Sequence, residues 1–232
     1  MNMTISLTTE KKQKIYDFAS KLLNMTNITI RILARFIGKI VSSFPAVQHG
    51  RLFYRNLEFL KIKALKVNQG NYDSYVLLDF DSKSEITWWR DNIMDSFAPI
   101  EPTPVDYSLK CDASKKGWGV SIPTSVFNGR WSLETQENHI NYLELLCIKY
   151  AIFSIASDNH KHIQIYSDNT TAIQHVNNKG GRVKYLNDLA KSIWMFAIKH
   201  NFTISAAHIP GIFNILADKG SGEFNDNLEW SL

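Results

Sequence analysis

Four acidic residues stand where the surrounding sequence is apolar. Asp112 ends a run that starts at Leu109, and Glu144 lies inside the run TyrLeuGluLeuLeu. Asp168 closes the segment IleTyrSerAsp, and Asp218 lies in a short helical pattern near the end of the chain. An ionised carboxylate in apolar surroundings costs several kcal/mol of desolvation unless it is paired or binds a cation. We therefore expect Asp112 to bind a metal ion and Glu144 to face a cleft.

Strand ends and a facing helix can bring such carboxylates together, and the group repels itself unless divalent cations neutralise it. Oxygen-only ligation favours Mg²⁺ or Mn²⁺ over zinc. Two ions about 3.5 to 4 Å apart would clamp an in-line displacement at phosphorus, activating water on one side and stabilising the leaving oxygen on the other. The predicted reaction is phosphodiester hydrolysis. Taken alone, Asp168 before AsnThrThr is explained equally well as a helix cap.

The second half of the chain alternates between strand and helix patterns. We expect strands at 107–113, 117–122, 128–133, 162–168 and 202–208, and helices at 139–157, 169–177, 185–200 and 214–219. Three strands in a meander, followed by alternating strand and helix, predict an α/β fold with a mixed sheet and helices packed on it.

The first hundred residues show helical periodicity. We expect helices from Thr8 or Thr9 to Asn24, from Thr29 to about Pro45, at 47–66, and after a capping box that spans Ser82 to Glu85. Three prolines in the segment AlaProIleGluProThrProValAsp then prevent a helix and form a connector. The predicted domains are 1–100 and 105–232.

Positive charge is concentrated in the first domain. The net charge is +4, and residues 1–100 carry 14 Lys and Arg against 9 Asp and Glu, whereas residues 101–232 carry 12 against 13. One short segment with a single acid, Glu58, holds eight of the basic residues: Arg31, Arg35, Lys39, Arg51, Arg55, Lys61, Lys63 and Lys66. This pattern indicates a surface that faces a polyanion, with a solvated helix face as the alternative.

The bulk composition restricts the class of protein. A chain of 232 residues with 44% hydrophobic residues is globular. It has no apolar run long enough to span a membrane and no secretory signal at its start, so we expect an intracellular protein, cytoplasmic or nuclear, without a membrane partner. Its two cysteines match neither a disulfide framework nor a metal-site spacing.

Four motifs occur in a fixed order: CysAspAlaSer with GlyTrpGly, AsnTyrLeuGluLeu, TyrSerAspAsnThrThrAla, and HisIleProGly followed by Asn and AlaAsp. Together they resemble the ribonuclease H domain of retroelement reverse transcriptases, most of all the DIRS-type and gypsy-type retrotransposons. The resemblance covers about Val105 to Ser221. It implies a ribonuclease H-like mixed five-stranded sheet flanked by helices, preceded by a small, mainly α-helical subdomain.

The resemblance implies roles for individual residues. Asp112, Glu144, Asp168 and Asp218 match the family's metal-binding carboxylates. His208 matches a mobile histidine thought to assist proton transfer and product release, which suits a group that titrates near neutral pH. A histidine that closes a strand before a proline turn is the alternative.

Three asparagines match nucleic-acid contacts of the family. Asn141 corresponds to a residue that reads the minor groove of an RNA·DNA hybrid, and its amide can both donate to and accept from a 2′-hydroxyl. Asn169 follows Asp168, where it would contact the DNA strand or waters bound to the metal, and helix capping explains it equally well. Asn214 fits the family's asparagine four residues before Asp218, or else caps the last helix.

The first hundred residues resemble the thumb or connection of DIRS-type proteins. No TyrXaaAspAsp or PheXaaAspAsp motif of a polymerase occurs, so we expect a reverse transcriptase polymerase domain in the same polyprotein as a partner. We expect the basic helices to hold the phosphates of a duplex, with a solvated helix face as the alternative. The candidate contacts are Arg31, Arg35, Arg51, Arg55 and Lys63.

Three functions remain open at this point. The first is a metal-dependent endonuclease that cuts RNA in RNA·DNA hybrids. The second is a non-catalytic scaffold that keeps the fold inside a larger reverse transcriptase or ribonucleoprotein, although such a domain would be expected to have lost an acid. The third is a transposase or integrase domain, which would need three principal acids rather than four and a histidine.

Overall fold

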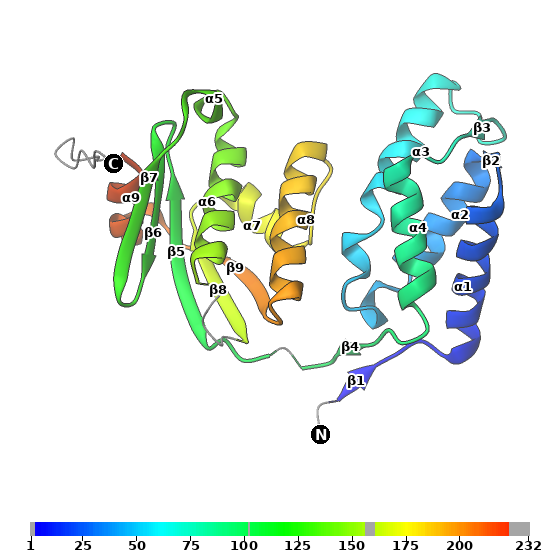
Figure 1. Cartoon of the computed structure of the whole chain (residues 1–232), viewed down its shortest axis with the longest axis horizontal. Helices are drawn as coiled ribbons and strands as arrows, with labels where there is room; N and C mark the ends of the chain where they lie inside the picture. The colour runs from blue at the N-terminus through cyan, green and yellow to red at the C-terminus, as the bar shows by residue number, and fades with distance from the viewer. Residues whose placement is uncertain (1–2, 102, 156–160, 223–232) are drawn as a thin grey trace, which may run out of the picture. The chain divides into compact units, whose positions relative to one another are not determined.

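The computed structural model describes residues 3–101, 103–155 and 161–222. The chain divides into two compact units, residues 1–102 and 103–232 (Figure 1). Within the described parts of both units, no helix combines the length and the hydropathy that crossing a bilayer would require.

Four helices make up most of the N-terminal unit. They are α1 (Thr9–Asn24), α2 (Ile30–Val41), α3 (Arg55–Val67) and α4 (Phe80–Asn92). Thr8 caps α1 by accepting the backbone N–H of Lys11, as the sequence predicts, and Thr29 caps α2 by accepting the N–H of Ile32. Two short antiparallel pairs accompany the helices: β1 (Thr4–Ile5) with β4 (Ala98–Pro99), and β2 (Ile28–Thr29) with β3 (Tyr75–Val76).

The helix predicted at 47–66 is wrong in its first half. After a 3₁₀ turn at η1 (Phe44–Ala46), the chain forms a second one, η2 (Gly50–Leu52), and α3 begins only at Arg55. A Cβ on Gly50 would lie 2.7 Å from Cη2 of Trp89, so this backbone fits directly beneath the indole ring. The indole N–H of Trp89 also donates to the carbonyl of Phe53. Packing on Trp89 therefore replaces the expected helical turns.

The capping box predicted at Ser82 to Glu85 is also wrong. Helix α4 begins earlier, because Asp79 accepts the backbone N–H of Ser82 at 2.8 Å and acts as the cap. The buried Glu85 carboxylate instead accepts from Leu57 N and from the Asn56 side chain, both in the first turn of α3. A carboxylate at the N-terminus of a helix interacts favourably with the helix dipole. Glu85 of α4 therefore stabilises the packing of α4 against α3.

The C-terminal unit is built on a five-stranded mixed sheet with the order β7-β6-β5-β8-β9. Strands β5 (Tyr107–Ala113), β6 (Gly117–Ile122) and β7 (Ser125–Arg130) form an antiparallel meander. Strands β8 (His162–Ser167) and β9 (Thr203–His208) add in parallel to β5. This is the strand arrangement of a ribonuclease H-like fold, and that prediction is confirmed.

The remaining elements are α5 (Leu133–Gln136), α6 (Ile140–Ser154), α7 (Thr170–Asn177), α8 (Lys184–Lys199), η3 (Gly211–Phe213) and α9 (Ile215–Gly222). The third strand lies three residues earlier than predicted, because Ile122 pairs with Ser125 across a two-residue turn that fixes the register. The predicted end of the long helix at Ser157 lies outside the described residues.

Helices α6 and α9 cover opposite faces of the sheet. Trp118 of β6 packs against Tyr150 of α6, with ring centroids 5.4 Å apart. The next residue, Gly119, faces α9 so closely that a Cβ there would overlap the carbonyl oxygen of Ala217. Successive residues of a strand point to opposite faces, so Asp112, the direct partner of Gly119, shares the face of α9.

Candidate active site

The predicted acids gather where strands β5 and β8 cease to pair. The parallel register of β5 with β8 ends at Lys110↔Tyr166, whereas β5 continues beside β6 to Ala113. We call this point, between the end of β5 and the end of β8, the fork. Ligand sites of open α/β sheets form outside the carboxyl ends of the strands, and the fork is such a place.

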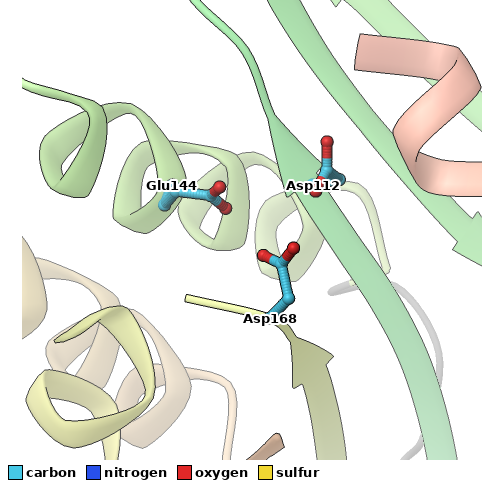
Figure 2. A group of neighbouring side chains, drawn as sticks. All are labelled: Asp112, Glu144 and Asp168. Atoms are coloured by element: carbon cyan, nitrogen blue, oxygen red, sulfur yellow. The ribbon is translucent and has the colours of Figure 1, made fainter. Parts of the chain in front are cut away.

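Three acids from three elements meet at the fork. Asp112 belongs to β5, Glu144 to the first half of α6, and Asp168 follows directly after β8. One carboxylate oxygen of each lies within 4.8 Å of the others. Figure 2 shows the three carboxyl groups beside one another. We refer to these three residues as the acid group.

Burial and mutual repulsion disfavour the ionised forms of this group. Asp112 and Glu144 are buried, and Asp168 is exposed. The pKa of Asp112 is raised to about 6, mainly by burial and further by the negative charges of Asp168 and Asp218. Burial, together with the charges of Asp112 and Asp168, raises the pKa of Glu144 to about 9. Without a counter-charge, three carboxylates are not all ionised here at neutral pH.

The donor set fits a divalent cation. All donors are carboxylate oxygens, which suit Mg²⁺ or Mn²⁺. The buried Oε2 of Glu144 has no hydrogen-bond partner, and an unsatisfied buried acceptor is costly unless another group binds it. Asp112, Glu144 and Asp168 are therefore the residues that would hold such an ion.

Ser221 connects Asp112 to helix α9. Its side chain is buried, and its hydroxyl lies 2.6 Å from Oδ2 of Asp112 and 2.9 Å from the carbonyl oxygen of Asp218. The hydroxyl has one proton to donate, and its hydrogen bond to Asp112 lowers the pKa of that carboxyl against the effect of burial. Ser221 thus fixes the orientation of the Asp112 carboxylate.

Sequence reasoning did not single out Ser221 or Gly119. Ser221 lies three residues after Asp218, on the same side of the helix, and this spacing was the available signal. Gly119 lies opposite Asp112 in the hairpin and admits α9 because it has no side chain. Neither role can be predicted without knowing that Asp112 pairs with Gly119 and that α9 packs against this pair.

Asp218 and His208 lie beside the acid group rather than in it. Asp218 is an exposed residue of α9, and its charge contributes to the raised pKa of Asp112. His208 is an exposed residue at the end of β9, paired with Ser167, the residue before Asp168. The loop after β9 also passes Asp168, since a Cβ on Gly211 would lie 3.5 Å from Oδ2 of that residue.

Two of the predicted asparagines contact each other. The Nδ2 of Asn169 donates to Oδ1 of Asn141 at 3.1 Å, while Oδ1 of Asn169 caps α7 by accepting the N–H of Ala172. Asn141 lies in the first turn of α6, three residues before Glu144. The amide pair therefore borders the acid group.

Asn214 is fully buried, and its Nδ2 donates to the carbonyl of Cys111, next to Asp112. Its side chain holds the segment before α9 against β5. The nucleic-acid contact expected for Asn214 stays a prediction, and the contact that the structure gives it is internal.

The five basic residues predicted to bind phosphate differ in their surroundings. Arg31 makes a two-point contact with Asp73 at 2.8 and 2.9 Å. Arg55 bonds to Glu58 and packs over the ring of Tyr54. Arg51 lies over the ring of Phe44. Arg35 and Lys63 are exposed, and neither has an ion-pair partner in the described part of the chain.

Solved structures similar to this chain include two ribonucleases H1. RNase H1 from the halophilic archaeon Halobacterium salinarum NRC-1 is 12% identical with a TM-score of 0.41, over 49% of this chain and 92% of that one. LC11-RNase H1 in complex with an RNA/DNA hybrid is 15% identical with a TM-score of 0.43, over 50% and 93%.

A foamy viral protease-reverse transcriptase in complex with double-stranded DNA is 14% identical with a TM-score of 0.34, over 88% of this chain and 42% of that one. No family model matches the sequence, and a search of the curated proteins finds no match. The fold assignment above rests on the strand order and register of the chain itself.

Proposed function

We propose that this chain is a metal-dependent endonuclease that hydrolyses the RNA strand of RNA·DNA hybrids, as part of a DIRS-type or gypsy-like retroelement reverse transcriptase. The observation that carries the proposal is the convergence of Asp112, Glu144 and Asp168 at the fork of a ribonuclease H-like sheet. These three carboxylates, from a strand, a helix and a strand end, form no ion pair with a cation of residues 3–101, 103–155 or 161–222.

Two Mg²⁺ or Mn²⁺ ions held by these acids, with Asp218 as a fourth, would activate water and stabilise the leaving oxygen. The residues around the acid group have their own tasks. Ser221 orients the carboxylate of Asp112 through its hydroxyl. His208, which pairs with Ser167 at the end of β9, would assist proton transfer and product release.

The amide pair would select the substrate. Asn141 and Asn169 hold each other at 3.1 Å, which fixes the orientation of both amides. A fixed amide that donates to and accepts from a 2′-hydroxyl distinguishes RNA from DNA. Removing Asn141 should therefore reduce the preference for the hybrid.

The N-terminal unit would hold the duplex, as a thumb or connection domain of about residues 1–100 that precedes a catalytic domain of about 105–232 in the chain. Its exposed cations, Arg35 and Lys63, offer phosphate contacts, and each neutralised phosphate would steepen the salt dependence of binding. A polymerase domain of the same polyprotein would complete the reverse transcriptase.

The test is cleavage of a hybrid labelled in its RNA strand, with Mg²⁺ or Mn²⁺, by the wild-type chain and by Asp112→Asn. Asp188→Asn is the matched control, because it removes one carboxylate from the exposed side of α8. Cutting of the hybrid but not of double-stranded DNA, lost only in Asp112→Asn, is the expected result. Binding of the hybrid without cutting under any metal condition would favour the scaffold function instead.

A further inference from the structure

A groove with an apolar floor and basic rims runs between α1 and α2 of the N-terminal unit. Its larger cavity has a volume of about 420 Å³. Phe18, Met25 and Ile32 form the floor, and all three are half-buried. Lys14 and Lys21 of α1 and Arg35 and Lys39 of α2 line the same cavity.

The groove is elongated. A second cavity of about 260 Å³ shares Lys14 and Lys39 with the first, and adds Leu7 and Ile15 to the apolar lining. Together the two cavities follow α1 over its whole length, which is about 24 Å for a 16-residue helix. A ligand that fills the groove is therefore a linear segment rather than a compact molecule.

Its positive charge is not neutralised within the described chain. Lys21, Arg35 and Lys39 are exposed, and none of them makes an ion pair with a described residue. Lys14 bonds to Glu10. The one acid of the lining, Asp17, accepts a hydrogen bond from the neutral Gln13. The rims thus carry an excess of cations on both sides of an apolar floor.

We propose that this groove binds an acidic amphipathic helix of a partner protein. A helix in a groove buries apolar side chains at i, i+3, i+4 and i+7 against the floor, and the flexible side chain of Met25 adapts to irregular shapes. Acidic residues on both flanks of that helix would meet Lys21 on one rim and Arg35 and Lys39 on the other. Such charge complementarity sets the partner and its orientation.

A nucleic acid fits this floor less well. Single strands bind where successive bases stack on aromatic faces, and the floor has one aromatic ring, Phe18. That ring already packs edge-on against Phe36 of the core, with centroids 5.4 Å apart at an angle of 78°. The remaining floor residues are aliphatic or sulfur-containing side chains, which complement apolar side chains instead.

The site shares no residue with the acid group, and of the cations proposed to contact the duplex it shares only Arg35, which the variants below leave in place. The test selects a library of helical peptides against the full chain, with counter-selection against Lys21→Glu/Lys39→Glu. Lys61→Glu/Lys66→Glu on α3 is the control, since it makes the same charge change away from the groove.

Enriched peptides should combine an apolar stripe with flanking acids, and they should bind Lys21→Glu/Lys39→Glu at least about tenfold more weakly than wild type or the control. Replacing the flanking acids of the peptide by lysine should restore binding to the groove variant. Two results would overturn the proposal: no enrichment of acidic amphipathic sequences, or peptides whose binding ignores the groove variant. A 20-nucleotide single strand that binds in their place, and loses affinity in the same variant, would identify a nucleic-acid groove.

Discussion

Replacing Asp112 by asparagine should stabilise the protein when no divalent cation is present. The pKa of Asp112 is raised from 3.8 to about 6 in the folded chain. Above that pH the ionised carboxylate costs the folded state about 3 kcal/mol, since one pKa unit corresponds to about 1.4 kcal/mol. Asparagine removes the charge and keeps an oxygen that accepts from Ser221.

The size of this gain depends on pH. A raised carboxyl pKa means that the folded state binds more protons than the unfolded state, so stability is lost as the pH rises from 3.8 through about 6. At pH 8 the free energy of unfolding of Asp112→Asn should exceed that of wild type by about 1 to 3 kcal/mol. The lower value allows for a weaker hydrogen bond from Ser221 to a neutral oxygen. Near pH 4 the difference should approach zero.

The assay is urea unfolding of the full chain in a chelator, at pH 4 and pH 8. Hydrogen-exchange labelling of the amides of β5 and β6 reports on the C-terminal unit separately from the N-terminal one. Asp188→Asn controls for the change in net charge, because its carboxylate is exposed. A variant less stable than wild type at pH 8, or an equal gain in Asp188→Asn, would refute the reasoning.

Mn²⁺ should raise the urea midpoint of the wild-type chain and leave that of Asp112→Asn nearly unchanged, because a cation that binds only the folded state stabilises it in proportion to its occupancy. Ser221→Ala should raise the Mn²⁺ concentration for half-maximal hybrid cleavage about tenfold, as for other residues that orient a metal ligand, and Ser221→Thr, which keeps the hydroxyl, should restore it. Gly119→Ala should lower the free energy of unfolding by about 2 kcal/mol and reduce cleavage, because the added methyl overlaps the carbonyl of Ala217.

Each of these outcomes has a clear opposite. An equal midpoint shift in Asp112→Asn would place the stabilising cation elsewhere. A Ser221→Thr variant no more active than Ser221→Ala would make the role of Ser221 one of packing rather than hydrogen bonding. A Gly119→Ala variant with normal unfolding and normal cleavage would show that α9 can shift without consequence.

Sequence patterns predicted the structure correctly where the neighbouring residues in the sequence determine the environment of a residue. An acid inside an apolar run is conspicuous, and this identified Asp112 and Glu144 before any contact was known. Strand and helix patterns likewise predicted five strands along the second half of the chain, with the third placed three residues late, because apolar spacing follows directly from burial. Even the caps of α1 and α2 were local, since Thr8 and Thr29 bond within three residues.

The predictions failed where the local conformation or the role of a residue depends on a contact with a residue far away in the sequence. Trp89 determines the backbone near Gly50, so the predicted helix at 47–66 is interrupted. Glu85 looked like part of its own helix cap but caps a neighbouring helix. Ser221 acquires its role only because Gly119 lets α9 approach β6. None of these contacts produces a periodic pattern in the sequence from which it could be predicted.

The three residues of the acid group lie on different elements around the fork. Asp112 lies on β5, which continues beside β6 past the fork, Asp168 follows β8, which pairs with β9, and Glu144 lies on α6. Strands β5 and β8 do not pair beyond Lys110, so no hydrogen bonds between these two strands fix the spacing of Asp112 and Asp168. Mild loosening of the sheet at the fork would therefore alter the spacing of the acids while every strand is still paired.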